Sequence, residues 1–264
     1  MIIKWQIEIM TSIIKNFPNW PAVDRIHAFI TERTGGFSTG KFESLNLAHH
    51  VNDDFSAVER NRGLLKSSVS ADLTFQWMHQ IHSDIVNVVS VPSPPMKGDS
   101  LICREPGIAC CVLTADCLPV FLTNLKGTEI AIIHAGWRGI CRGILSKTIN
   151  KMCSEPNELM AWLGPAIGPC HYEVGDDLKI AFKKSIGSEM LWSRIETCFE
   201  DSPTEGKYFL DLSKSAAVIL KYLGISNIYE DDHCTFRDSE KYFSHRRDGE
   251  TGRMVSTIFI DPRI

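Results

Sequence analysis

The chain has 264 residues, and its 28 Lys and Arg against 32 Asp and Glu leave a net charge of −4. This charge excludes the basic field that a nucleic-acid-binding protein needs. Apolar residues make up 44% of the sequence, enough for a substantial core, and none of their runs reaches the ~18 residues that span a bilayer.

The N-terminal apolar stretch is interrupted by Lys4, Gln6 and Glu8, so it lacks the continuous apolar segment of a signal peptide. The nine cysteines are an odd number and include no CxxC pair, which argues against a disulfide framework. We therefore expect a cytoplasmic protein without nucleic-acid or membrane partners. Its thiols are free for packing, metal binding or catalysis.

Several short segments rich in Val, Ile, Phe and Cys predict buried strands. In chain order they are residues 86–91, 108–113, 119–124, 129–134, 159–163, 227–230 and 254–260. Helices are predicted at residues 57–66, 138–152, 176–186 and 212–223 from apolar spacing and cap residues. The Pro-rich stretch 91–99 reads as a surface loop. Strands and helices mix without a strict βαβ rhythm, which favours a single α+β domain over residues 1–264, with mixed sheets packed together and helices outside.

Three blocks place a potential metal ligand beside or at the end of a predicted strand. They are WMHQIHSD with His82, LTADCLP with Cys117 and IAIIHAGWRGI with His134. Imidazole nitrogen and thiolate sulfur suit Zn(II), and three protein ligands would leave a fourth position open for water or substrate. The spacing alone leaves a second interpretation open, in which both histidines are satisfied within the core and Cys117 is a packed thiol.

The HAGWRG block also predicts a strand-to-helix turn at Gly136 and Gly139. Unpaired N–H groups of such a turn can hold an anion or an oxyanion, and Arg138 could add charge there. The alternative is an ordinary tight turn with Trp137 in the core and Arg138 in solvent.

The sequence resembles the laccase-domain family, whose members are named multicopper polyphenol oxidoreductase, peptidoglycan editing factor or purine nucleoside phosphorylase. The resemblance is carried, in the family's order, by RTGGFSTGKFESLNLAHHVNDD (33–54), ERNR (59–62), HQIHSD (79–84), GDSLI (98–102), LTADCLPV (113–120), HAGWRG (134–139), LGPAIGPCHYEVGDD (163–177) and FSHRRDGETGRM (243–254). Asn52, His79 and His245 depart from the family's usual Gly, Asn and Tyr.

The resemblance implies one zinc bound by His82, Cys117 and His134. From the donor types alone, copper is a possible substitute, because Cu(II) outcompetes Zn(II) at most nitrogen and sulfur sites. It implies an α+β fold similar to toxin-type cysteine hydrolases. It also implies phosphorolysis of purine nucleosides (adenosine, inosine, guanosine and methylthioadenosine), adenosine deamination or, in older naming, copper-dependent phenol oxidation. The small-molecule partners would be a purine nucleoside and phosphate.

For deamination, zinc would lower the pKa of a bound water toward ~7 for attack at C6 of adenine, with Asp116 or Glu173 moving the proton. For phosphorolysis, arginine forks suit phosphate. The candidates are Arg33, Arg62, Arg138, Arg246, Arg247 and Arg253, and Arg33, near Ser38, and Arg246–Arg247 are favoured. Ser44 and Asn46 are candidates for hydrogen bonds to base or ribose, although Asn46 could instead hold a turn.

A rival hypothesis is a Cys–His amidohydrolase acting on a cell-wall precursor, with Cys117 as nucleophile and His134 as base. Copper-dependent polyphenol oxidation ranks last, because nine histidines do not supply the ligands of several copper centres. A binding module without catalysis is a further alternative.

Overall fold

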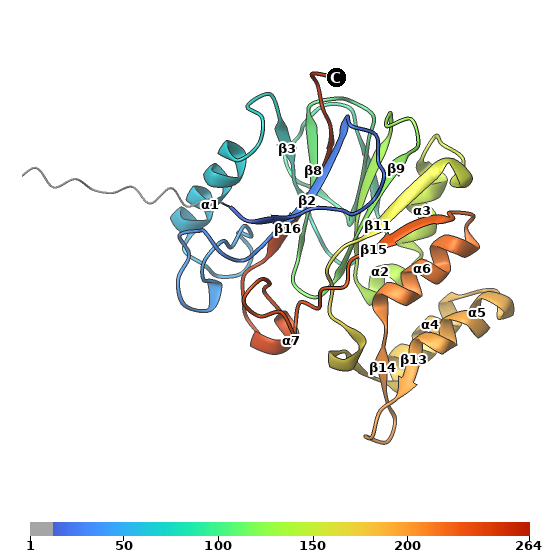
Figure 1. Cartoon of the computed structure of the whole chain (residues 1–264). Coiled ribbons are helices and arrows are strands. Elements are labelled where there is room, and N and C mark those ends of the chain that lie inside the picture. Colours follow the sequence, from blue (N-terminus) through green and yellow to red (C-terminus); the bar gives the residue numbers. More distant parts are fainter. Residues whose placement is uncertain (1–12) are drawn as a thin grey trace, which may run out of the picture.

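The computed structural model describes residues 13–264. The N-terminal stretch that argued against a signal peptide lies outside these residues. Two large sheets pack face to face (Figure 1). The first has the order β1-β2-β16-β8-β3 and the second the order β15-β11-β9-β10-β7-β5. Their bounds are β1 Lys15–Asn16, β2 Ile26–Thr31, β3 Thr74–Gln76, β5 Val86–Val89, β7 Ser100–Cys103, β8 Ile108–Thr114, β9 Leu118–Asn124, β10 Ile130–Ala135, β11 Leu159–Leu163, β15 Asn227–Glu230 and β16 Met254–Ile260.

Both sheets are mixed. Pairs β3–β8, β5–β7 and β11–β15 are parallel, and the other pairs in these sheets are antiparallel. Two smaller sheets join β4 (Met78–His79) to β6 (Met96–Lys97), and β12 (Glu173–Gly175) to β14 (Lys207–Leu210) and β13 (Phe199–Asp201).

The central strands are buried on both faces, which is why their sequences show little polar alternation. In β9, Phe121 points into the core between the sheets, while Val120 and Leu122 point to the opposite core under the helices. In β8, Val112 faces the core between the sheets and Leu113 the outer core. This two-residue period decides which side chains at the strand ends can meet.

Helices cover the outer faces (Figure 1). Helix α1 (Phe55–Ser67) and the preceding loop pack on the five-stranded sheet. The six-stranded sheet is covered by α2 (Trp137–Cys141), α3 (Ile144–Lys151) and α6 (Leu212–Tyr222), while α4 (Asp176–Ser185) packs against α2 and α5 (Glu189–Ile195) against α6. A single turn, α7 (His245–Asp248), precedes β16. Short 3-10 turns occupy Gly40–Phe42, Pro156–Glu158, Pro169–His171 and Glu196–Cys198.

The fold-class prediction of mixed α+β layers is confirmed, and a strand lies in each of the seven predicted segments. The predicted helix 138–152 is instead two helices, because Gly143 adopts a left-handed conformation (φ 83°) between α2 and α3. Strand β2 and helix α5 were not predicted. In β2, His27 and Thr31 interrupt the apolar run.

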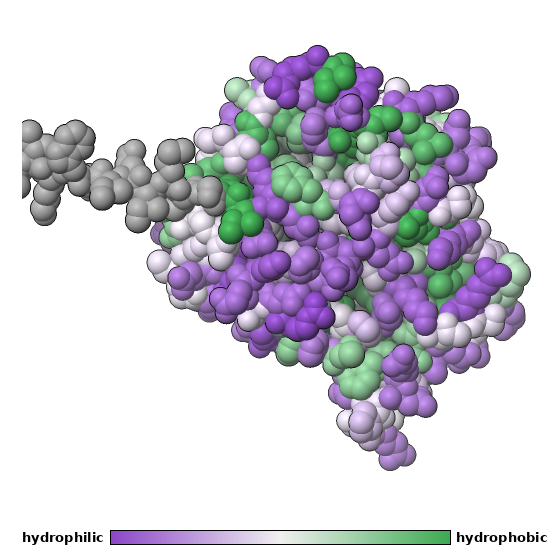
Figure 2. Space-filling model, in the orientation of Figure 1, coloured by the Kyte–Doolittle hydropathy of each residue, from purple (hydrophilic) through white to green (hydrophobic). Residues whose placement is uncertain are grey.

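Hydrophilic residues cover most of the face in Figure 2, and apolar side chains gather on it only in small groups. Within residues 13–264, no helix combines the length and the hydropathy that crossing a bilayer requires.

Candidate metal centre

Two chain segments cross from the five-stranded to the six-stranded sheet, and each carries a predicted ligand. Residues 115–117 join β8 to β9 and carry Cys117, and the segment between β3 and β5 carries His82. Both crossings are sharp: His82 (φ 53°) and Asp116 (φ 85°) lie in the left-handed region, which side-chain-bearing residues rarely adopt. The side chain of Gln80 ties the crossings together through two hydrogen bonds to the backbone of Leu113, at 2.8 and 2.7 Å.

The third predicted ligand comes from the end of β10. Ile130 and Ile132 of this strand point into the core between the sheets, and His134 continues the same face. As a result, one donor atom each from His82, Cys117 and His134 lies within 4.8 Å of the others. The Cys117 Sγ to His82 Nε2 distance is 3.9 Å. A tetrahedral zinc with one sulfur and one nitrogen ligand places these atoms about 3.6 Å apart, so the cluster fits zinc with little movement.

Asp99, which precedes β7, contacts the ring of His134 and the backbone of His82. Its Oδ1 lies 2.8 Å from His134 Nδ1 and accepts the backbone N–H of His82 at 3.1 Å. Its Oδ2 accepts the backbone N–H and the hydroxyl of Ser83, both at 2.6 Å. The carboxylate thus favours a proton on His134 Nδ1 and leaves Nε2 to face the cluster, as in metal-ligating histidines with an orienting carboxylate.

The three groups influence each other's protonation. Burial opposes ionisation of Cys117, but the adjacent His134 and His82 outweigh it and lower the thiol pKa to about 6. Burial disfavours a charged His134, yet Cys117 and Asp99 raise its pKa to about 9. Burial likewise opposes the charge on Asp99, and hydrogen bonds from His134 and Ser83 lower its pKa to about 2. The cluster therefore stabilises a thiolate, the form that binds metal.

Gly136 is required beside the cluster. A Cβ at this position would lie 3.0 Å from Cys117 Sγ and 3.2 Å from His82 Cδ2. Its φ of −71° is open to any residue, so the constraint is space and not backbone conformation. The HAGWRG turn therefore allows α2 to start directly against the ligands.

A cavity of about 180 Å³ opens beside the cluster. His82 and Cys117 line it, together with Trp137, Arg138, Ile167, Tyr172, Leu212, His245 and Arg246. Arg246 lies 5.0 Å from the centre of the Tyr172 ring and donates to the Glu173 carbonyl at 2.9 Å. Arg138 lies 4.3 Å over the ring of Trp137. Aromatic faces and guanidinium groups together can hold a flat, polar heterocycle.

Asp116 also lines this cavity but has both carboxylate oxygens engaged. Oδ1 accepts from Thr235 Oγ1 and Oδ2 from the Arg246 backbone N–H, each at 2.7 Å. Asp116 thereby fixes the segment that carries Arg246 next to the Cys117 turn. One carboxylate oxygen of Glu173 is also engaged, because its Oε1 accepts from Ser202 Oγ at 2.6 Å.

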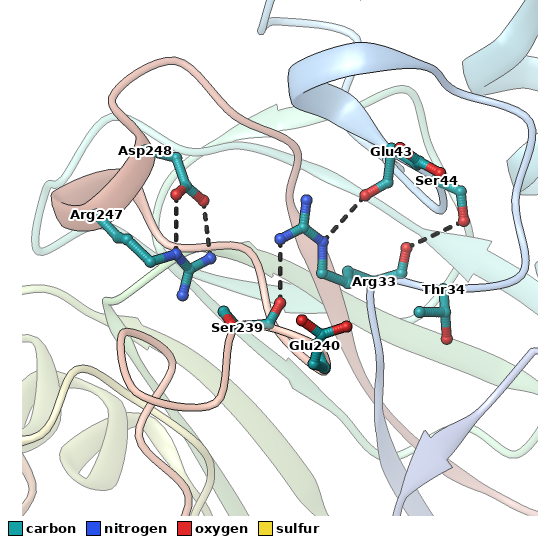
Figure 3. A pocket seen from close by; sticks show the side chains of 8 residues that line it. All are labelled: Arg33, Thr34, Glu43, Ser44, Ser239, Glu240, Arg247 and Asp248. Atoms are coloured by element: carbon teal, nitrogen blue, oxygen red, sulfur yellow. Dashed lines mark hydrogen bonds and ion pairs between the residues drawn. The ribbon is translucent and has the colours of Figure 1, made fainter.

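Arg33 and Arg247 lie at a separate pocket, with Ser44 on its wall (Figure 3). Arg33 donates to the carbonyls of Glu43 and Ser239, at 3.0 and 3.1 Å. Arg247 donates to Asp248 and to the carbonyls of Thr235, Phe236 and Tyr242. In these positions the two guanidinium groups join loops together, and the structure does not bring them into the cavity beside Cys117.

Ser38 and Asn46 are buried in a polar network. Ser38 Oγ donates to Asp53 at 2.6 Å, and Asn46 donates to the same oxygen at 2.9 Å. Asn46 Oδ1 also accepts the backbone N–H groups of Ala48 and Arg253. These bonds tie the 38–53 loop to itself and to Arg253, the residue before β16.

Residue-by-residue reasoning on the sequence missed Asp99, Gln80 and Tyr172. Asp99 directly precedes a buried strand, the same signal that singled out the other strand-end residues. No local pattern marks Gln80 or Tyr172, because their partners are distant in sequence.

The family described as multi-copper polyphenol oxidoreductase laccase has a profile that matches residues 27–261. The chain belongs to this family. A Haemophilus influenzae relative named purine nucleoside phosphorylase is 40% identical over 245 residues, covering 92% of this chain and 98% of the relative. The Escherichia coli K12 protein named purine nucleoside phosphorylase YfiH is 36% identical, with coverage of 92% and 97%.

Solved structures of this laccase family have the same fold. A Neisseria meningitidis protein described as DUF152 superimposes with a TM-score of 0.87 at 39% identity, covering 94% of this chain and 99% of that one. YlmD from Geobacillus stearothermophilus gives a TM-score of 0.84 at 30% identity, with coverage of 91% and 94%.

Proposed function

We propose that this protein is a zinc-dependent purine nucleoside phosphorylase that also deaminates adenosine. The observation that carries the proposal is the convergence of His82, Cys117 and His134 beside a cavity lined by Trp137 and Tyr172. The names of the relatives support the phosphorylase part of this proposal. The aromatic walls would hold the purine, and Arg246 would bind its polar edge or the ribose.

Zinc, when bound, supplies a Lewis acid and lowers the pKa of water in its open coordination position. In phosphorolysis a phosphate oxygen forms a bond to C1′ of the ribose. The bond from C1′ to N9 breaks, its electron pair leaves with the purine, and the purine takes up a proton from solvent. The chain contributes by holding both substrates in line and by excluding water from C1′.

The test compares wild type with Cys117→Ser and with the control Cys153→Ser. The Cys153 thiol is exposed, and its backbone contacts Glu129, at the opposite end of β10 from His134. Elemental analysis measures zinc per chain. Phosphate-dependent release of the free base from adenosine and inosine measures phosphorolysis, and phosphate-independent release of ammonia from adenosine measures deamination. We expect one zinc per chain in wild type and the control, and loss of zinc and activity in Cys117→Ser. Equal zinc in all three proteins would refute the ligand assignment.

A second candidate is a Cys–His amidohydrolase acting on a cell-wall precursor. The distance of 3.9 Å between Cys117 Sγ and His82 Nε2 favours this hypothesis. Chelation and alkylation separate the two hypotheses. A nucleophilic Cys117 predicts that activity on such a precursor survives removal of zinc and is lost after alkylation. A zinc phosphorylase loses activity on chelation and regains it when zinc is added back.

A further inference from the structure

Cationic side chains gather where the five-stranded sheet ends beside the metal cluster. Met254 pairs with Thr114, so Arg253 lies where β8 runs into the turn that carries Cys117. The Leu47 N–H donates to the Arg253 carbonyl at 3.3 Å, and Arg62 Nε of α1 donates to the Leu47 carbonyl at 3.0 Å. One short segment therefore ties Arg62 and Arg253 together, and it continues directly to His50.

The positive charges of Arg62 and Arg253 act on the imidazole of His50. Burial lowers the His50 pKa, and the positive charges of Arg253, His79, Arg62 and His134 lower it further. The residues of the metal centre also affect Arg253. Burial lowers the pKa of Arg253, while the negative charges of Cys117 and Asp116 raise it. Because Met254 pairs with Thr114, Arg253 lies on the β8 side of the turn that carries Cys117, and the aromatic cavity lies beside the same cysteine.

The two guanidinium groups keep donors free of carboxylates. Arg253 uses Nη1 on the carbonyls of Thr251 and Gly252, at 2.7 and 2.9 Å. Arg62 lies over the ring of Trp77, with 4.0 Å between its guanidinium carbon and the ring centre. Within residues 13–264, the arginines that form ion pairs with carboxylates are Arg104, Arg237, Arg247 and Arg263. The charges of Arg62 and Arg253 are therefore available to an anion.

We propose that Arg62 and Arg253, with the imidazole of His50, form the binding subsite for the phosphate dianion that attacks the nucleoside. This inference rests on the proposed function and assigns the phosphate a place that Arg33 and Arg247 do not provide. Arginine forks and imidazole N–H groups match the oxygens of phosphate. With phosphate on the β16 side of Cys117 and the nucleoside in the aromatic cavity, the two reactants meet beside the metal centre.

The variants His50→Gln, Arg62→Gln and Arg253→Lys test the subsite, with Arg60→Gln as the matched control. Arg60 lies on the same helix but stacks on Phe37, with 3.5 Å between its guanidinium and the ring centre, outside the cluster. We expect the KM for inorganic phosphate to rise roughly tenfold or more in the three variants, because His50→Gln loses the imidazole donor, Arg62→Gln loses the charged donor and Arg253→Lys loses the planar fork that matches two phosphate oxygens. The KM for inosine, the zinc content and the Arg60→Gln control should not change.

Binding of inorganic phosphate, measured by calorimetry without nucleoside, tests the subsite independently of turnover. Weaker phosphate binding in the variants supports the subsite even if the wild type fails to cleave nucleosides, an outcome that would reject the proposed function alone. Phosphate-dependent turnover with an unchanged phosphate KM in His50→Gln and Arg62→Gln overturns the subsite. Loss of adenosine 5′-monophosphate binding in the variants, with the KM for inorganic phosphate unchanged, would also overturn it, because the cluster would then hold a nucleotide's phosphate.

Discussion

Asp99 and His134 form a buried carboxylate–imidazole pair, with 2.8 Å between Oδ1 and Nδ1. The side chains are 0% and 4% exposed, so solvent does not screen the pair. Because the same carboxylate also holds the backbone of His82, one residue positions two of the three proposed ligands.

The substitution Asp99→Asn keeps the shape of the side chain and removes its charge. We expect zinc affinity to fall by roughly 10–100-fold, the usual effect of losing a group that orients a metal ligand. Competition with a fluorescent chelator measures the affinity, and Asp24→Asn, at an exposed position, is the control. Unchanged affinity in Asp99→Asn would show that the cluster does not depend on this carboxylate.

The substitution Gly136→Ala should impair metal binding, because the new methyl group would lie 3.0 Å from Cys117 Sγ. Gly63→Ala is the matched control, since a Cβ there meets no atom within 4 Å. Gly63 lies within helix α1, so alanine should stabilise the protein by about 0.5–1 kcal/mol. Zinc content and urea unfolding of both variants check these outcomes, and normal zinc occupancy in Gly136→Ala would contradict the first.

Arg246→Gln tests the cavity as the nucleoside site. We expect the KM for inosine to rise by roughly tenfold, the cost of one hydrogen bond to a charged group, while zinc content stays unchanged. Arg194→Gln, on the exposed side of α5, controls for the loss of one positive charge. A rise in the phosphate KM alone would instead place Arg246 in the phosphate subsite.

Trp162→Ala tests the core between the sheets. The indole is fully buried and packs on Phe121 at a centroid distance of 4.7 Å. Its removal should lower the free energy of unfolding by about 3–5 kcal/mol. Met190→Ala, at a side chain that is 57% exposed, should change it little. Denaturant unfolding followed by circular dichroism compares the two, and similar stabilities would contradict this description of the core.

The sequence alone determined much of the β-structure, since the central strands are short apolar runs and each predicted strand is present. It also singled out the residues that converge, because His82, Cys117 and His134 each lie beside or at the end of such a run. Local patterns suffice for these features because burial on both faces of a strand leaves a continuous apolar signature.

Only the tertiary structure decided how these strand ends meet. The register of β16 on β8 brings Arg253 beside Cys117, and the crossing held by Gln80 presents His82 to His134. It also separated Arg33 and Arg247, which the sequence had grouped with the site, from the cavity. The physical reason is that contacts between residues far apart in the chain depend on strand pairing and sheet packing, which no local spacing encodes.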